Sequence, residues 1–163
     1  MTAIDHLLER HAVRHTDGDV AALPPDPAAG VAIVTCMDAR VDVYATFGVR
    51  RGEIHVLRNA GGLATDDTLR SLAISQSLLG TREVMLIQHT DCGMSKLSNA
   101  AIAEAIERRS GTRPPTPLGA FDELDASVRR SVEILRACPF LPHRDAIRGF
   151  VLDVDSARLR EVE

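Results

Sequence analysis

Three continuous apolar segments constrain the fold of this chain more than any other feature. They are "GVAIVTC" at residues 30–36, "EIHVLRN" at 53–59 and "REVMLIQHT" at 82–90. The first and third lack the polar alternation of a half-exposed strand, which is typical of strands covered on both faces. Such strands occur in parallel sheets, where the connecting helices cover both faces.

Helical patterns lie between and after these strands. The sequence predicts helices over 41–47, 66–80, 98–109 and 121–138, and either Thr65 or Asp66 caps the second of them. The last segment, "RGFVLDVDSARLREVE", predicts two strands around a "DSA" turn. We therefore expect an α/β fold with a central, mostly parallel sheet flanked by helices. About four strands are parallel and an antiparallel strand lies at one edge. Aromatic residues make up only 3% of the chain, so the core must be aliphatic.

The N-terminal segment is predicted to be separate from this sheet. Residues 4–15 show helical spacing of Ile4, Leu7 and Leu8, and "GDVAALPPDPAAG" (18–30) predicts an extended linker. We therefore divide the chain into a helical arm with a Pro-rich linker (1–29) and a sheet domain (30–163). A linker of this kind allows the helix to pack on a neighbouring molecule.

Charge and cysteine content exclude several classes of protein. The net charge is −4 and no long basic run occurs, which argues against nucleic-acid binding. The N-terminus does not resemble a signal peptide, and no apolar stretch is long enough to span a bilayer, so we expect a cytoplasmic protein without membrane contact. Three cysteines, an odd number, favour metal binding or catalysis over a disulfide framework.

Metal-ligating residue types follow two of the predicted strands. Cys36 ends the first strand, and His89 and Cys92 follow the third. In open parallel sheets, ligands bind beyond the carboxyl ends of the strands. Two thiolates and one imidazole suit zinc, and three protein ligands leave a fourth position open, as in catalytic sites. The alternative is that the cysteines are small core residues and the histidine is an ordinary buried one.

Asp38 and Arg40 alternate with Cys36 in "VTCMDARVD" (34–42). In an extended chain they would lie roughly 7 and 14 Å beyond Cys36, so a bend is needed to gather the three side chains. Asp38 then either binds zinc as a fourth ligand and closes the site, or is gripped by Arg40 and orients a zinc-bound hydroxide. Without a metal nearby, the two residues would be an ordinary ion pair.

These motifs resemble those of the β-class carbonic anhydrases. "CMDAR" and "HTDCGM" resemble the two zinc motifs of that family, and "RNAGG" (58–62) resembles the loop between them. The resemblance extends from about Val31 to Val154, and "SLAISQSLLGTREV" is most similar to the compact actinobacterial and mycobacterial type. It implies that Cys36, His89 and Cys92 are the zinc ligands of a β-carbonic anhydrase-like domain over 30–163. It also implies that Asp38 and Arg40 form its catalytic dyad.

The resemblance also implies a function and an assembly. The expected reaction is the reversible hydration of CO2 to bicarbonate and a proton by zinc-bound hydroxide, in a homodimer or possibly a homotetramer. Two thiolates neutralise the charge of zinc, so we expect activity to rise at alkaline pH. Gly93, Asn59 and Gly61 are candidates for substrate contact, although each also suits a plain turn.

Two other functions remain open at this stage. One is hydrolysis of carbonyl sulfide or carbon disulfide by the same zinc chemistry. The other is a non-catalytic zinc sensor, against which the intact Asp38–Arg40 pair argues.

Overall fold

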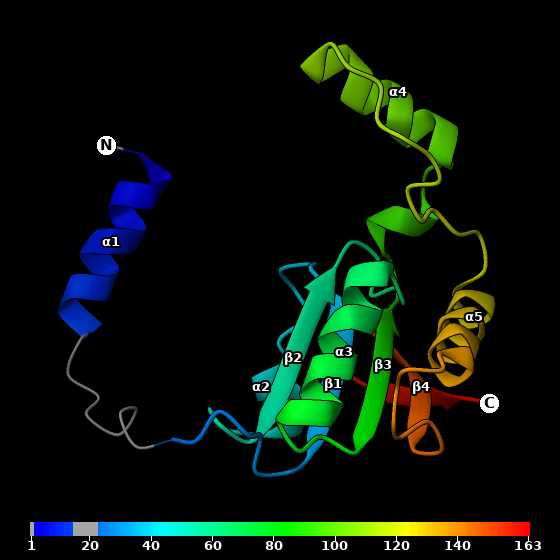
Figure 1. The fold of residues 1–163 in the computed structure, drawn as a ribbon. Helices are drawn as coiled ribbons and strands as arrows, with labels where there is room; N and C mark the ends of the chain where they lie inside the picture. The colour runs from blue at the N-terminus through cyan, green and yellow to red at the C-terminus, as the bar shows by residue number, and fades with distance from the viewer. Residues whose placement is uncertain (1, 15–22) are drawn as a thin grey trace.

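A five-stranded sheet forms the centre of the computed structural model, which describes residues 2–14 and 23–163 (Figure 1). Its strands are β1 (Val31–Cys36), β2 (Ile54–Asn59), β3 (Glu83–His89), β4 (Ile147–Leu152) and β5 (Leu159–Val162). The order is β2-β1-β3-β4-β5, with only β5 antiparallel to its neighbour. The predicted α/β fold with an antiparallel edge strand is therefore confirmed.

The predicted helices of the sheet domain are also present. They are α2 (Val43–Phe47), α3 (Asp66–Leu78), α4 (Asn99–Ser110) and α5 (Leu124–Ala137), with a short 3-10 helix, η2 (Gly93–Ser95). Thr65, rather than Asp66, caps α3, because its side chain accepts a hydrogen bond from the Thr68 N–H. Helix α5 begins at Leu124, three residues later than 121, and the Phe121 N–H donates to the Met94 carbonyl oxygen.

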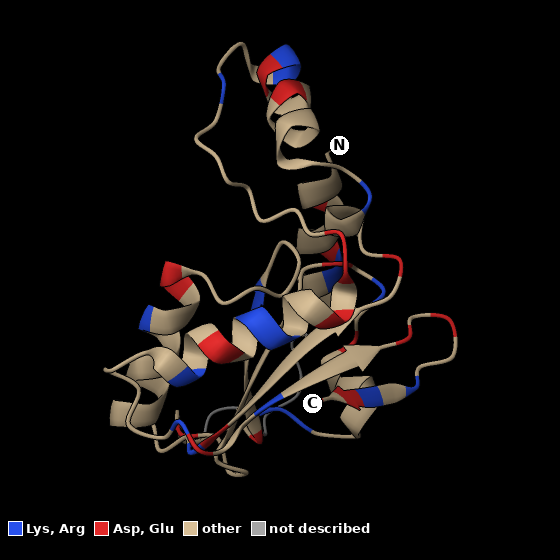
Figure 2. Cartoon of the chain, turned by 90° about the vertical axis from the view of Figure 1, so that its right-hand side faces the viewer, with Lys and Arg blue, Asp and Glu red and all other residues tan. Residues whose placement is uncertain are grey.

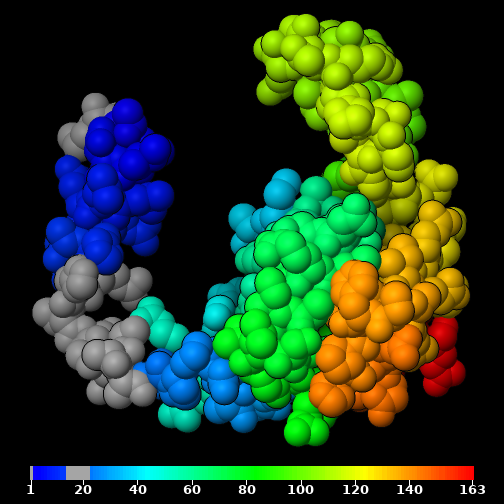
Figure 3. Space-filling model, in the orientation of Figure 1, coloured from blue at the N-terminus to red at the C-terminus, as the bar shows by residue number. Residues whose placement is uncertain are grey.

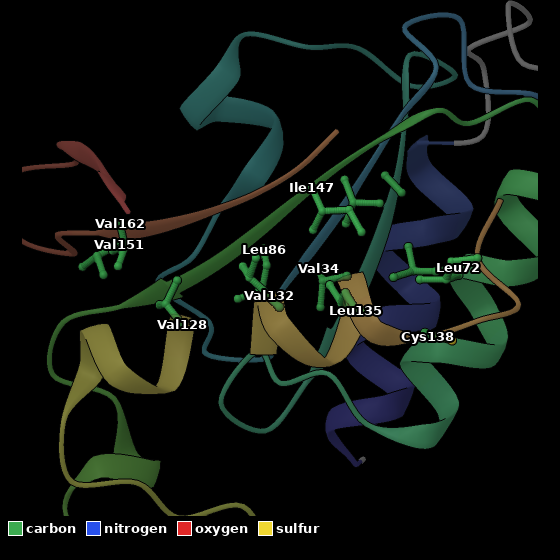
Figure 4. Packing of buried hydrophobic residues seen from close by; sticks show 13 residues of the cluster. Val34, Leu72, Leu86, Val128, Val132, Leu135, Cys138, Ile147, Val151 and Val162 are labelled. Carbon is green, nitrogen blue, oxygen red and sulfur yellow. The ribbon is translucent and has the colours of Figure 1, made fainter. Parts of the chain in front are cut away.

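Both faces of the sheet are buried, which explains the continuous apolar strands. On one face, Val34 and Leu86 pack in a cluster with residues of α3 and α5, and Figure 4 shows Val132 and Leu135 of α5 within it. On the other face, Ile33 and Ile87 pack with residues around α2. Neighbouring residues of β1 thus enter two different clusters, so neither face of the strand can be polar.

Charged side chains lie mainly on the helices and loops. Figure 2 shows both signs along the outer face of α5, whereas the middle of the sheet is almost free of them. Asp125 of α5 is paired with Arg160 of β5, which fixes the helix to the edge strand. Within the described residues, no helix combines the length and the apolar character needed to cross a bilayer.

Helices α1 (Ala3–Arg14) and α4 stand away from the body. Figure 3 shows them on either side of a wide open space. The apolar side chains of Ile4, Leu7 and Leu8 are 60–68% exposed. Residues 28 and 29 of the linker bond to the backbone just before β2. Residues 15–22 of the predicted helix and linker lie outside the described residues, and the division at residue 29 stays a prediction.

Candidate metal centre

The three predicted ligands meet at the carboxyl end of the sheet. Strands β1 and β3 are parallel neighbours, so Cys36 and His89, their last residues, lie side by side. A turn through Asp91, whose backbone has φ of 56°, brings Cys92 back to them. The Cys36 and Cys92 sulfurs are 4.0 Å apart, and one ligand atom from each of the three residues lies within 4.8 Å of the others. All three side chains are buried.

His89 presents one ring nitrogen to this cluster. Its Nδ1 lies 2.8 Å from the Thr90 carbonyl oxygen, to which it donates, and this leaves the Nε2 lone pair free in the neutral ring. Nε2 is buried without a hydrogen-bond partner among the described residues. A buried polar atom without a partner is costly, and a metal ion would satisfy it. The donor set of one imidazole and two sulfurs therefore fits zinc.

The surroundings of the cysteines favour a thiolate. The hydrogen bond from Cys92 lowers the pKa of the Cys36 thiol, against the effect of burial, and the Asp38 and Gly61 N–H groups act in the same direction. The same interaction raises the pKa of Cys92, which keeps the shared proton. Zinc binds the thiolate form, so an ion here would take the place of that proton.

Asp38 and Arg40 form a bidentate ion pair beside the three candidate ligands. Arg40 donates from Nε to Asp38 Oδ1 at 3.0 Å and from Nη2 to Asp38 Oδ2 at 2.8 Å. These bonds hold the pKa of Asp38 well below its usual range, so the carboxylate stays ionised. Asp38 Oδ2 also lies 3.8 Å from His89 Nε2, which places the carboxylate at the edge of the candidate metal position.

The neighbouring strand β2 braces this loop. Arg58 donates to the carbonyl oxygens of Cys36 and Asp38, at 2.9 and 2.6 Å. The amide of Asn59 is bonded within its own loop, to the backbone of Leu63 and the hydroxyl of Thr68. The structure therefore gives Arg58 and Asn59 a clear part in the shape of the site, whereas substrate contact by Asn59 stays a prediction.

The glycines of the site differ in whether their backbone conformation or the lack of space for a Cβ atom requires glycine. Gly62 has φ of 63°, and a Cβ there would lie 2.9 Å from the Cys36 nitrogen and from the Ile87 carbonyl oxygen. Sequence reasoning overlooked Gly62, although "GG" after a strand was a signal for a close backbone approach. Gly61 has φ of 86° and supports the Cys36 sulfur through its N–H. Gly93 does not have a left-handed backbone, and no atom lies within 4 Å of a Cβ added there, so neither conformation nor space requires glycine at this position.

The sequence of this chain is similar to sequences of known proteins over most of its length. The sequence pattern of the family described as carbonic anhydrase matches residues 31–154. Over 162 residues the chain is 44% identical to Beta-carbonic anhydrase 1 of Mycobacterium tuberculosis, covering 99% of both chains. The chain belongs to the β-carbonic anhydrase family. This conclusion confirms the resemblance stated from "CMDAR" and "HTDCGM".

Other relatives include a solved structure with the same fold and a protein named for a different substrate. A crystal structure of carbonic anhydrase from Streptococcus mutans is 38% identical and superposes with a TM-score of 0.94, covering 100% of this chain and 99% of the other. The carbon disulfide hydrolase of an Acidianus species is 32% identical over 154 residues, covering 79% of this chain and 75% of the relative. Proteins named for two different substrates therefore share this sequence family.

Proposed function

We propose that this chain is a zinc enzyme that catalyses the reversible hydration of CO2 to bicarbonate and a proton. One observation carries the proposal. Cys36, His89 and Cys92 offer three ligand atoms around one point, beside a carboxylate that Arg40 holds. Three ligands with a fourth position free for water are typical of catalytic zinc.

Each residue has a separate task in this reaction. When bound, zinc lowers the pKa of its water from 15.7 towards about 7, which supplies a nucleophile near neutral pH. Cys36, His89 and Cys92 hold the ion, and the bond from His89 Nδ1 to Thr90 fixes the ring orientation. Asp38, kept ionised, accepts a hydrogen bond from the reacting water and orients its lone pair. Arg40 keeps that carboxylate from binding the ion itself.

The substrate lies next to Cys92 in this proposal. Gly93 follows that ligand and leaves open space where a side chain would stand, so its backbone can approach a small, linear substrate. Asn59 and Gly61 act more indirectly, because their polar groups already shape the loop and support Cys36.

Carbon disulfide hydrolysis is the second candidate, because relatives with that name share the sequence family. We favour carbon dioxide as the substrate, because the mycobacterial carbonic anhydrase matches 99% of this chain at 44% identity. The carbon disulfide hydrolase matches 79% of it at 32% identity. A stopped-flow CO2 assay on the zinc-loaded protein, run beside a sulfide-release assay with carbon disulfide and carbonyl sulfide, tests this. We expect fast CO2 turnover and slow sulfide release. Full zinc occupancy with no turnover of any of the three substrates would instead support the sensor.

We also propose that the working unit is a homodimer and that two dimers can assemble into a tetramer. The exposed apolar side chains of α1 support this, because a second copy would bury them. A cytoplasmic location is proposed as well, and it is supported by the three cysteines, all of which are free and buried.

A further inference from the structure

Arg40 is bound by two carboxylates, and only one of them belongs to the dyad. Besides Asp38, its Nη1 donates to Asp91 Oδ2 at 2.7 Å, and its Nη2 donates to the Asp91 carbonyl oxygen at 3.1 Å. Asp38 and Asp91 therefore hold the planar guanidinium at two edges. A guanidinium fixed at both edges cannot rotate without breaking charge-assisted hydrogen bonds.

Asp91 is itself fixed by its surroundings. It lies between His89 and Cys92 in the turn that carries two of the three ligands. Its left-handed backbone, with φ of 56°, is a conformation that Asp and Asn tolerate better than most residues. Lys96, just after η2, places its Nζ 2.5 Å from Asp91 Oδ1. Lys96, Asp91, Arg40 and Asp38 thus form one chain of alternating charge that ends beside the ligands.

We infer that Asp91 is a positioning residue, which anchors Arg40 to the ligand turn and thereby keeps Asp38 off the metal. Arg58 braces the backbone of the loop that carries Asp38 and Arg40, but the bonds between these two side chains do not fix the side chains relative to His89 and Cys92. Asp91 ties the pair to a segment 51 residues away in sequence. Without that tie, the pair can shift together, and the carboxylate can take the fourth zinc position. This inference rests on the proposed function, because it concerns the same open position.

The test uses Asp91→Asn, which keeps the backbone carbonyl, the size of the side chain and tolerance of a left-handed backbone. Zinc is replaced by cobalt(II) in the full-length protein, and azide is titrated while the visible absorption of the metal is recorded. Azide needs the open fourth position, so a closed population weakens its apparent affinity in proportion. We expect the apparent Kd of azide to rise by about tenfold, the lower end of what outer-shell partners contribute, with a similar fall in kcat for the zinc form.

The direction in which the apparent Kd of azide changes in Asp91→Asn separates this inference from a simple charge effect. Removing a negative charge near the metal would by itself strengthen the binding of an anion, whereas closure by Asp38 weakens it. Asp125→Asn is the matched control, since Asp125 is paired with Arg160 and its side chain is 40% exposed, compared with 49% for Asp91. The control should leave azide affinity unchanged.

Unchanged or tighter azide binding in Asp91→Asn would overturn the inference. Should that variant fail to fold or to bind metal, Asp91→Glu decides, because it keeps the charge, which removes any direct charge effect on azide, and displaces the carboxylate from Arg40 by one methylene group. A rise of about threefold in the apparent Kd supports the inference, on the scale of an exposed ion pair, and no rise contradicts it. The titration needs no turnover, so a wild-type protein that binds azide but does not hydrate CO2 would refute only the proposed function.

Discussion

The carboxyl end of the sheet and helix α1 show two different ways in which a sequence uses its side chains. At the sheet end, the proposed ligands are buried, and hydrogen bonds from Arg58 of β2 and between Arg40 and the turn after β3 hold the loops around them. In α1, the apolar side chains of Leu7 and Leu8 are exposed, and Thr2 and Asp5 bond to each other at its start. The residues of the site contact one another within one chain, whereas the apolar side chains of α1 are exposed and are proposed to pack against a second copy.

Removing a ligand should have the largest effect. In Cys92→Ser a hydroxyl replaces the thiolate, and we expect zinc affinity to fall by more than about 100-fold, because even outer-shell partners contribute 10- to 100-fold. Carbon dioxide hydration should be lost with the metal. Zinc content by atomic absorption, measured beside the hydration rate, checks this. Cys138→Ser, a change at a buried cysteine in the core cluster, is the control and should keep its zinc.

Removing Arg40 should leave the metal bound and slow CO2 hydration strongly. Arg40→Ala frees Asp38, and we expect the carboxylate to bind zinc as a fourth ligand, with unchanged zinc content and a rate lowered by about 100-fold. A crystal structure of the variant shows which group occupies the fourth position. A bound water with normal turnover would show that Arg40 does not restrain Asp38. Arg70→Ala, which breaks a surface pair with Asp67, is the matched control.

Changes in α1 should act on assembly and spare the metal. In the double variant Leu7→Glu, Leu8→Glu, we expect the dimer dissociation constant to rise by at least about tenfold, since buried apolar anchors dominate such interfaces. Sedimentation equilibrium measures this, and zinc content should not change. Arg10→Glu alters the charge of the same helix without touching those side chains. If the double variant assembled like wild type, α1 would not be part of the interface.

The surface pair of Asp125 and Arg160 should have the smallest effect. Arg160 lowers the pKa of Asp125 in the folded protein, so the pair stabilises the fold above the unfolded pKa of about 4 and loses that contribution as pH falls below it. Because both side chains are substantially exposed, Asp125→Asn should cost only about 0.5 kcal/mol at pH 7. Urea unfolding at pH 7 and at pH 3.5 should show this difference shrinking on acidification. A difference that grows with acid would contradict the assignment.

The strand ends were predictable because local patterns determine them. Apolar runs located β1 and β3, and the rule that parallel strands share a carboxyl edge placed Cys36 next to His89. Residues that act across the fold were not predictable in this way. Gly62 is required by its distance from the Cys36 backbone, and Asp91 by its bond to Arg40, 51 residues away.

The most direct test of the central claim is zinc content measured together with the CO2 hydration rate from pH 6 to pH 9. The account predicts one zinc per chain and a rate that rises with pH, because two thiolate ligands reduce the acidity of the bound water. A protein that folds but holds no zinc, or holds one zinc and shows no hydration at any pH in this range, would contradict it.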